Sequence, residues 1–177
     1  MSILLVFIFA YLIGSLPTGY FLVKVINGKD VRLIESGRTG GTNVMRAAGW
    51  LAGSTAAVLD VIKGMSSAWI VNRIAPNRPL IMVAAAIIVI IGHNYSIFLI
   101  ERKPDGKFHL RGGAGGATCL GGAIALWQGS WIIIPLAVMV FLFIGYASIT
   151  TISIGAFNLM IFSYQFHNRD LKSFLVW

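Results

Sequence analysis

Long apolar segments alternate with short polar segments along this chain. The first three apolar runs cover residues 3–26, 51–74 and 80–100. A helix needs about 20 mainly apolar residues to span a bilayer. Each run therefore predicts one membrane-spanning helix, and the first is too long for a signal peptide and is expected to be retained.

Two further apolar runs complete the pattern. Residues 117–127 are too few to span alone, so we expect a helix that begins within the preceding glycines or crosses only part of the bilayer. Residues 131–166 are too many for one helix. Pro135, Gly145 and Gly155 are the positions at which we expect this run to divide.

The composition indicates that these segments are surrounded by membrane lipid. Of the 177 residues, 57% are hydrophobic and 11% are charged, whereas soluble domains carry about 25% charged residues. No period-two alternation indicates a barrel. The sequence predicts an all-α polytopic transmembrane bundle, a single integral membrane domain over residues 1–177, with about five to seven membrane helices.

The polar loops cover residues 27–49, 72–79 and 101–111, and the chain has a net charge of +8. Most loop cations lie in the first and third loops, which three spans place on the same side of the membrane. Lys and Arg are enriched in cytoplasmic loops. We therefore expect these two glycine-rich loops to be cytoplasmic and the N-terminus to lie outside. The same cations could instead serve an anionic ligand.

The first loop combines glycines, hydroxyl groups, an amide and arginines within a dozen positions, namely Ser36, Gly37, Arg38, Thr39, Gly40, Gly41, Thr42, Asn43 and Arg46. Glycines allow successive backbone N–H groups to converge on an anion, and arginine adds bidentate bonds to phosphate. A flexible turn carrying topogenic arginines is the alternative.

The third loop ends in a glycine run, Arg111-Gly112-Gly113-Ala114-Gly115-Gly116-Ala117-Thr118, that leads into an apolar helix. The free N–H groups and dipole at a helix start favour anions. This run is not a Walker A loop, since no Lys-Ser/Thr pair follows. Close helix packing is the alternative, but two such loops on one face favour phosphate binding.

Three polar residues fall within the apolar segments. Asp60 and Lys63 are three positions apart, so they could simply neutralise each other or could hold the first loop. His93 could be a packed residue, a general base or a phosphate donor. The spacing of His93, His109 and His167 does not indicate a metal site.

Several segments together resemble the acyl-phosphate:glycerol-3-phosphate acyltransferase (PlsY) family. They are Tyr11-Leu12-Ile13-Gly14-Ser15-Leu16-Pro17-Thr18-Gly19-Tyr20, Ser36-Gly37-x-x-Gly40-x-Thr42-Asn43-Val44-x-Arg46, Leu59-Asp60-x-x-Lys63-Gly64, Gly92-His93-x-Tyr95 and Gly112-Gly113-x-Gly115-x-Ala117-Thr118. Their order and spacing agree with the family over about the first 120 residues.

This resemblance implies a bacterial inner-membrane enzyme that transfers an acyl group from acyl phosphate to the 1-hydroxyl of glycerol 3-phosphate, giving lysophosphatidic acid. It implies Ser36, Arg46 and His93 as catalytic residues. The substrate-binding residues that it implies are Asn43, Thr42, Gly112, Gly113, Gly115, Thr118, Arg111 and Lys63. No cofactor, metal or nucleic acid is implied, and we expect a monomer in the lipid bilayer.

The sequence departs from the family pattern at several points. Ala114 occupies the position of a family lysine, for which Lys107 or Arg111 could substitute from the other side of a turn. About seven extra residues lie around 101–109. The stretch at Ser148 lacks a family arginine, and the run 167–170 is only a faint match to the family's closing motif.

These departures keep two other hypotheses open. One is a catalytically degenerate relative that binds a phosphorylated substrate or a partner protein. The other is a small transporter, for which the intramembrane Asp60 and Lys63 are the only support.

Overall fold

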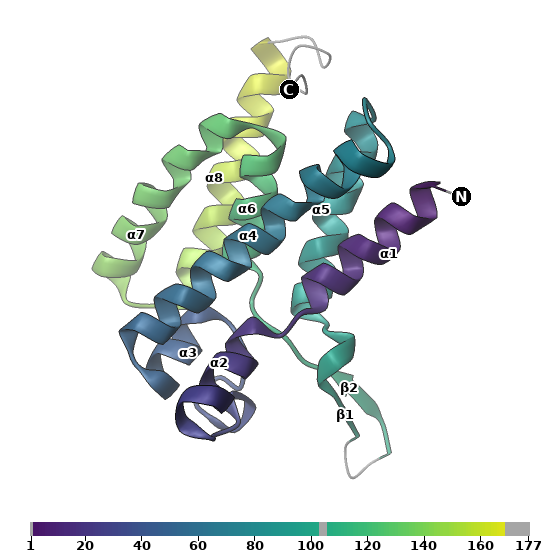
Figure 1. The fold of residues 1–177 in the computed structure, drawn as a ribbon. Helices are drawn as coiled ribbons and strands as arrows, with labels where there is room; N and C mark the ends of the chain where they lie inside the picture. Colours follow the sequence, from purple (N-terminus) through teal and green to yellow (C-terminus); the bar gives the residue numbers. More distant parts are fainter. Residues whose placement is uncertain (1, 103–105, 169–177) are drawn as a thin grey trace.

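A computed structural model describes residues 2–102 and 106–168, so Lys103, Arg169 and Asp170 lie outside the described residues. Figure 1 shows a helical bundle with a small hairpin at one end. The α-helices are α1 (Ser2–Ser15), α2 (Thr18–Asn27), α3 (Gly41–Ala48), α4 (Trp50–Ile74), α5 (Pro79–Asn94), α6 (Gly116–Leu126), α7 (Ile133–Ile144) and α8 (Ala147–Asn168). The strands are β1 (Ile100–Arg102) and β2 (Phe108–Leu110), and the 3-10 helices are η1 (Val31–Leu33), η2 (Ile97–Leu99) and η3 (Gln128–Ile132).

The predicted polytopic helical bundle is confirmed. Helix α4 packs against α1, α5 and α6, and α8 covers α6 and α7. Within the described residues, three helical stretches are long and apolar enough to cross a membrane, namely Ile3–Asn27, Pro79–Leu99 and Ala147–Gln165. The first and third polar loops meet at the end of the bundle that carries α2, α3 and the hairpin, while the N-terminus lies at the other end (Figure 1).

The sequence pattern predicted one continuous helix for the first apolar run, but the structure divides this run into two helices. Helix α1 ends at Ser15, and α2 begins at Thr18. Pro17 has no N–H group to donate and restricts the residue before it, so it interrupts the helical ladder here. The break leaves the carbonyl of Leu16 pointing to the Lys63 ammonium, 2.8 Å away.

The third apolar run also ends earlier than predicted, because α5 stops at Asn94 rather than near residue 100. The Ser96 hydroxyl accepts the N–H of Phe98 and donates to the carbonyl of Ser15. This side chain therefore starts η2 and fixes the turn against α1, which ends the helix.

Two loops contain more regular structure than the sequence indicated. Residues Gly41–Ala48 of the first loop form α3, and the third loop forms an antiparallel hairpin in which Ile100 pairs with Leu110 and Arg102 with Phe108. Helix α6 begins within the glycine run, as expected. Of the three candidate break points in the last run, the chain uses Gly145, which has φ +75° and ends α7.

Helices α4 and α6 approach closely through small residues. A Cβ atom added to Gly64 would lie 2.6 Å from the backbone nitrogen of Gly122, and one at Gly121 would overlap the carbonyl of Val61. Small residues allow such backbone contact within a membrane. The contact fixes the start of α6, and with it the glycine run, relative to the first loop before α4.

Candidate functional site

The two glycine-rich loops bind each other directly. The Thr39 N–H donates to the carbonyl of Gly112 at 3.3 Å, and the guanidinium of Arg38 donates to the carbonyl of Gly113 at 2.9 Å. These bonds join residues more than 70 positions apart in the sequence. The two loops therefore form one structural unit, as their charge and glycine content predicted.

Asn43 on α3 determines the shape of the first loop. Its Nδ2 group lies 3.1, 3.0 and 2.9 Å from the carbonyl oxygens of Val31, Ile34 and Arg38. The side chain is buried behind the loop. Asn43 thus positions the loop backbone, and its expected contact with substrate stays a prediction.

Arg32 connects the same loop to the hairpin. Its guanidinium pairs with Asp30 at 2.6 Å and with Glu101 of β1 at 2.8 Å, and it lies over the ring of Tyr20. The hydrogen bond from Arg32 holds the pKa of the Asp30 carboxyl below its usual value of 3.8. Arg32 is consequently engaged by acidic groups and does not supply a cation for a ligand.

The glycine run is held against the end of α5. The Gly113 N–H donates to the carbonyl of His93 at 3.0 Å, and Gly115 adopts φ +86°, which favours glycine and starts α6. A Cβ atom at Gly115 would lie 2.7 Å from Oδ1 of Asn94. The close contacts explain why this segment contains glycines instead of larger residues.

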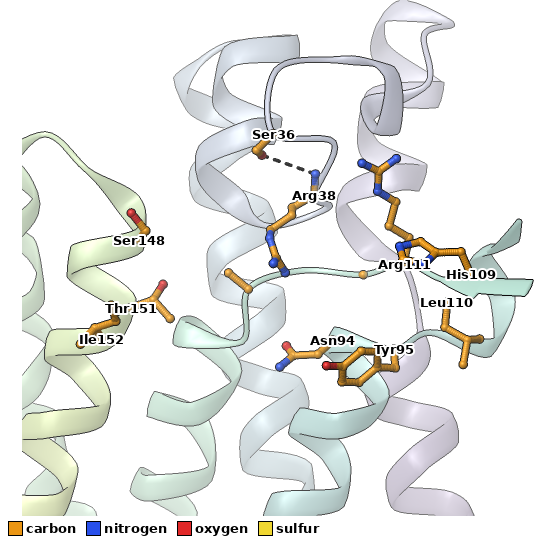
Figure 2. A pocket seen from close by; sticks show the side chains of 12 residues that line it. Ser36, Arg38, Asn94, Tyr95, His109, Leu110, Arg111, Ser148, Thr151 and Ile152 are labelled. Atoms are coloured by element: carbon orange, nitrogen blue, oxygen red, sulfur yellow. Dashed lines mark hydrogen bonds between the residues drawn. The ribbon is translucent and has the colours of Figure 1, made fainter. Parts of the chain in front are cut away.

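A cavity of about 550 Å³ lies where these loops meet the start of α8. It is lined by Ser36, Arg38, Asn94, Tyr95, His109, Leu110, Arg111, Gly112, Ala114, Ser148, Thr151 and Ile152. Figure 2 shows the first loop on one side of the glycine segment, the end of α5 on the other, and the α8 side chains facing them across the space.

The cavity is suited to an anion. Arg38 and Arg111 bring two guanidinium groups, and Ser148 and Thr151 bring hydroxyl groups from the first turns of α8. The N-terminal ends of α6 and α8 both lie beside the cavity, so their dipoles add partial positive charge. No acidic side chain is among the described residues that line it.

A second, apolar groove of about 120 Å³ is lined by residues of α5, α6 and α8. Its lining residues on α5, α6 and α8 are Val83, Ala86, Ile87, Ile90, Cys119, Gly122, Ala123, Leu126, Asn158 and Phe162. The two hollows thus share helices but differ in chemistry, since the groove is almost wholly apolar.

Among the residues predicted from the sequence, Ser36, Arg111 and Gly112 line the cavity. Gly113 and Gly115 belong to its glycine segment but pack against His93 and Asn94. The roles of all these residues stay predictions, and the side chains of the others are not among the described lining groups of this cavity.

Arg46, Thr42 and Thr118 lie away from the cavity lining. Arg46 is about half exposed on α3 and lies 3.9 Å from the Glu35 carboxylate. Thr42 is half-buried on the same helix, and Thr118 is buried where α6 meets α4. A direct contact between any of these three and a ligand would require it to reach beyond this cavity.

Asp60, Lys63 and His93 form a buried polar cluster below the glycine segment. The Lys63 ammonium lies 2.8 Å from the Asp60 carboxylate, which also accepts a hydrogen bond from Thr18 at 2.9 Å. Asp60 and Lys63 do pair, as one of the two sequence hypotheses proposed. Their further contacts hold the break between α1 and α2 instead of the first loop.

Sequence reasoning did not select Arg38, Asn94, Tyr95, His109, Ser148 or Thr151 as site residues. Arg38 was visible within the first loop, but only the fold shows that it crosses to Gly113. Within the described residues, no group of three His, Cys, Asp or Glu side chains is placed to hold a metal ion.

Comparisons with known proteins agree with the resemblance seen in the sequence. A family model described as glycerol-3-phosphate acyltransferase matches residues 4–177. The chain is 32% identical to glycerol-3-phosphate acyltransferase 2 of Moorella thermoacetica, covering 90% of this chain and 78% of that protein. It is 36% identical to glycerol-3-phosphate acyltransferase 3 of Dehalococcoides mccartyi, covering 90% and 76%.

The fold is similar to a solved membrane protein. The crystal structure of PlsY, an integral membrane glycerol 3-phosphate acyltransferase in its glycerol 3-phosphate form, superposes with a TM-score of 0.78 at 30% identity. That match covers 93% of this chain and 78% of the other. The chain spans smaller parts of some relatives, such as 56% of the Myxococcus xanthus protein and 65% of the Thermus thermophilus protein.

Proposed function

The chain belongs to the glycerol-3-phosphate acyltransferase family, and on that premise we propose that it transfers a fatty acyl group from acyl phosphate to glycerol 3-phosphate. The product is lysophosphatidic acid. The observation that carries the proposal is one cavity, built by both glycine-rich loops and α8, that combines two arginines with a glycine backbone and several hydroxyl groups.

The proposed reaction needs positioning and charge stabilisation more than a strong nucleophile. The 1-hydroxyl oxygen of glycerol 3-phosphate attacks the acyl carbonyl carbon, the bond from that carbon to the phosphate oxygen breaks, and inorganic phosphate leaves. A phosphate oxygen takes the hydroxyl proton. Placing two anions side by side in the right geometry supplies much of the rate.

Arg38 and Arg111 are the proposed phosphate-binding cations. Ala114 lines the cavity but bears no charge, so it cannot replace the family lysine itself. Arg38 already reaches across to Gly113, and Arg111 lies close beside Gly37 in the first loop. The two guanidinium groups, with Ser36, Ser148 and the backbone at Gly112, can bind phosphate oxygens.

The acyl chain is proposed to lie in the apolar groove between α5, α6 and α8. Residues of α5 and α8 line both the groove and the polar cavity, and the lining of the groove is almost entirely apolar. A substrate with a charged head and a long hydrocarbon tail therefore meets matching surroundings at both ends.

We further propose that the end of the bundle with the two loops faces the cytoplasm of a bacterial cell, with the N-terminus outside. The cations Lys24, Lys29, Arg32, Arg38, Arg46, Arg102, Lys107 and Arg111 lie on this side of the chain's helices, whereas Arg73 and Arg78 lie at the other end. A monomer is the expected state.

The test is formation of lysophosphatidic acid by the purified protein from a synthetic acyl phosphate and labelled glycerol 3-phosphate. The Arg38→Ala/Arg111→Ala double variant is the negative control. Arg73→Ala is the matched control, because Arg73 lies over Trp69 at the other end of α4. No product above the double variant would refute the proposed activity.

A degenerate relative that only binds is the second candidate, and the neutral Ala114 in the cavity favours it. It predicts that glycerol 3-phosphate raises the melting temperature of the protein while no product forms. Product formation would exclude this candidate.

A further inference from the structure

The buried cluster of Asp60, Lys63 and His93 is more polar than helix packing requires. The Lys63 ammonium contacts the Asp60 carboxylate and the Leu16 carbonyl, both at 2.8 Å. Burying two charges is costly unless they are paired and hydrogen-bonded. These contacts satisfy that condition, so the ammonium is held in one position within the bundle.

That position determines which nitrogen of His93 carries the proton. The Lys63 Nζ lies 3.3 Å from Nδ1 of His93. An ammonium has only donors, so Nδ1 must accept in this contact, and the ring proton of a neutral imidazole then lies on Nε2. The Asp60 oxygen is farther from Nδ1, at 3.6 Å, and already accepts from Lys63 and Thr18.

The other ring nitrogen faces the glycine segment. A Cβ atom added to Gly113 would overlap Nε2 of His93, so the ring edge packs on the Gly113 backbone. Gly113 also donates its N–H to the His93 carbonyl and accepts from Arg38. His93 itself is 5% exposed and is not one of the described residues that line the cavity.

We propose that Lys63, held by Asp60, fixes His93 as a neutral imidazole with its proton on Nε2, whose ring edge supports the glycine segment by packing on it, so that His93 is a positioning residue and not the general base. The effect on catalysis rests on the proposed function. In this arrangement the substrate proton passes to a phosphate oxygen, and the histidine proton stays on Nε2 throughout the reaction.

The tautomer can be measured without any activity assay. The His109→Gln/His167→Gln variant, labelled with ¹⁵N-histidine, contains only His93. Long-range ¹⁵N–¹H correlation spectra in detergent micelles should show a neutral ring with its proton on Nε2. A ring protonated on Nδ1, or on both nitrogens at neutral pH, would overturn the proposal, and this result stands whether or not the protein makes lysophosphatidic acid.

Two neutral substitutions test the role in turnover. In His93→Gln the side-chain amide nitrogen can lie near the position that Nε2 occupies in the wild type. In His93→Asn the shorter side chain places the amide nitrogen only near the position of Nδ1. Loss of the contact between this side chain and the segment is expected to lower the rate by about tenfold. We expect His93→Gln to retain activity within about tenfold of the wild type and His93→Asn to lose at least about tenfold more.

Equal loss in both folded variants would show that a titrating imidazole is required and would overturn the proposal. If His93→Asn does not fold, Asp60→Asn/Lys63→Met provides the second measurement. That pair removes both charges together and leaves an oxygen for Thr18. The labelled His93 ring should then lose its single-tautomer spectrum, and an unchanged spectrum would contradict the role assigned to Lys63.

Discussion

Replacing Asn43 with aspartate should open the first loop, although this side chain is not among the described residues lining the cavity. The amide has two hydrogen atoms, and its Nδ2 lies within hydrogen-bond distance of three loop carbonyls. A carboxylate of the same size has no donor, so it turns these contacts into repulsions. Asn43 is buried, which prevents water from replacing the lost bonds.

The size of the effect follows from these bonds. Two lost hydrogen bonds at about 1 kcal/mol each, with at least one buried carbonyl left unpaired at about 1–3 kcal/mol, give roughly 3–5 kcal/mol. For a chain of this length that corresponds to a fall in melting temperature of about 10 °C. Lysophosphatidic acid formation should fall as well, because Arg38 is on the released loop.

Asn27→Asp is the matched control for this prediction. It makes the same chemical change at an exposed site, where the amide donates only to the carbonyl of Ala47. Thermal unfolding of both variants in the same detergent would check the prediction. Equal melting temperatures would refute the claim that Asn43 holds the loop.

Two further changes test the packing and the charges around the site. Gly64→Ala should destabilise the protein by about 1–3 kcal/mol in thermal unfolding, because the added Cβ would force α4 away from α6. Gly155→Ala is the control and should be neutral or stabilising, because the space around Gly155 is open. Similar losses of stability in both variants would contradict this account. The lowered pKa of Asp30 means that its contribution to stability is complete above pH 3.8 and is lost as the pH falls through the folded value. The difference in melting temperature between wild type and Asp30→Asn should therefore shrink below pH 3.8, and a difference that grows there would contradict the Asp30–Arg32 pairing.

The positions of the helices could be predicted because they follow the lengths of the apolar runs. Runs of about 20 apolar residues are read directly from the sequence, and α4 follows the predicted run within one residue at its start. The helix ends were less predictable, since they depend on tertiary contacts. α5 stops at Asn94 because Ser96 bonds to Ser15 of another helix, a contact that no local pattern reveals.

The site was predictable as a pair of loops but not as a set of side chains. Glycine content and charge indicated that the two loops share one face, and the bonds from Thr39 and Arg38 to the glycine run agree with this. Which arginine enters the cavity depends on the loop path that Asn43 fixes. Arg46 lies about one helical turn after Asn43 on α3, at the surface, 3.9 Å from the Glu35 carboxylate.

The hairpin shows a further limit of the sequence pattern. Residues around 101–109 were recognised as extra, but their pairing as strands was not predicted. The hairpin brings His109 and Arg111 to the cavity, and Arg32 ties its first strand to the first loop through Glu101. A segment that the family resemblance predicts to be extra thereby contributes to the candidate site.

The central claim is that the cavity between the two loops binds glycerol 3-phosphate and directs its 1-hydroxyl oxygen to an acyl carbon. Mass spectrometry of the product made from glycerol 3-phosphate carrying ¹⁸O in that hydroxyl tests this directly. The account predicts lysophosphatidic acid that retains the ¹⁸O in its ester with the wild type, and a loss of product of at least about tenfold with Arg38→Ala. An unlabelled ester, or equal product from the wild type and Arg38→Ala, would contradict it.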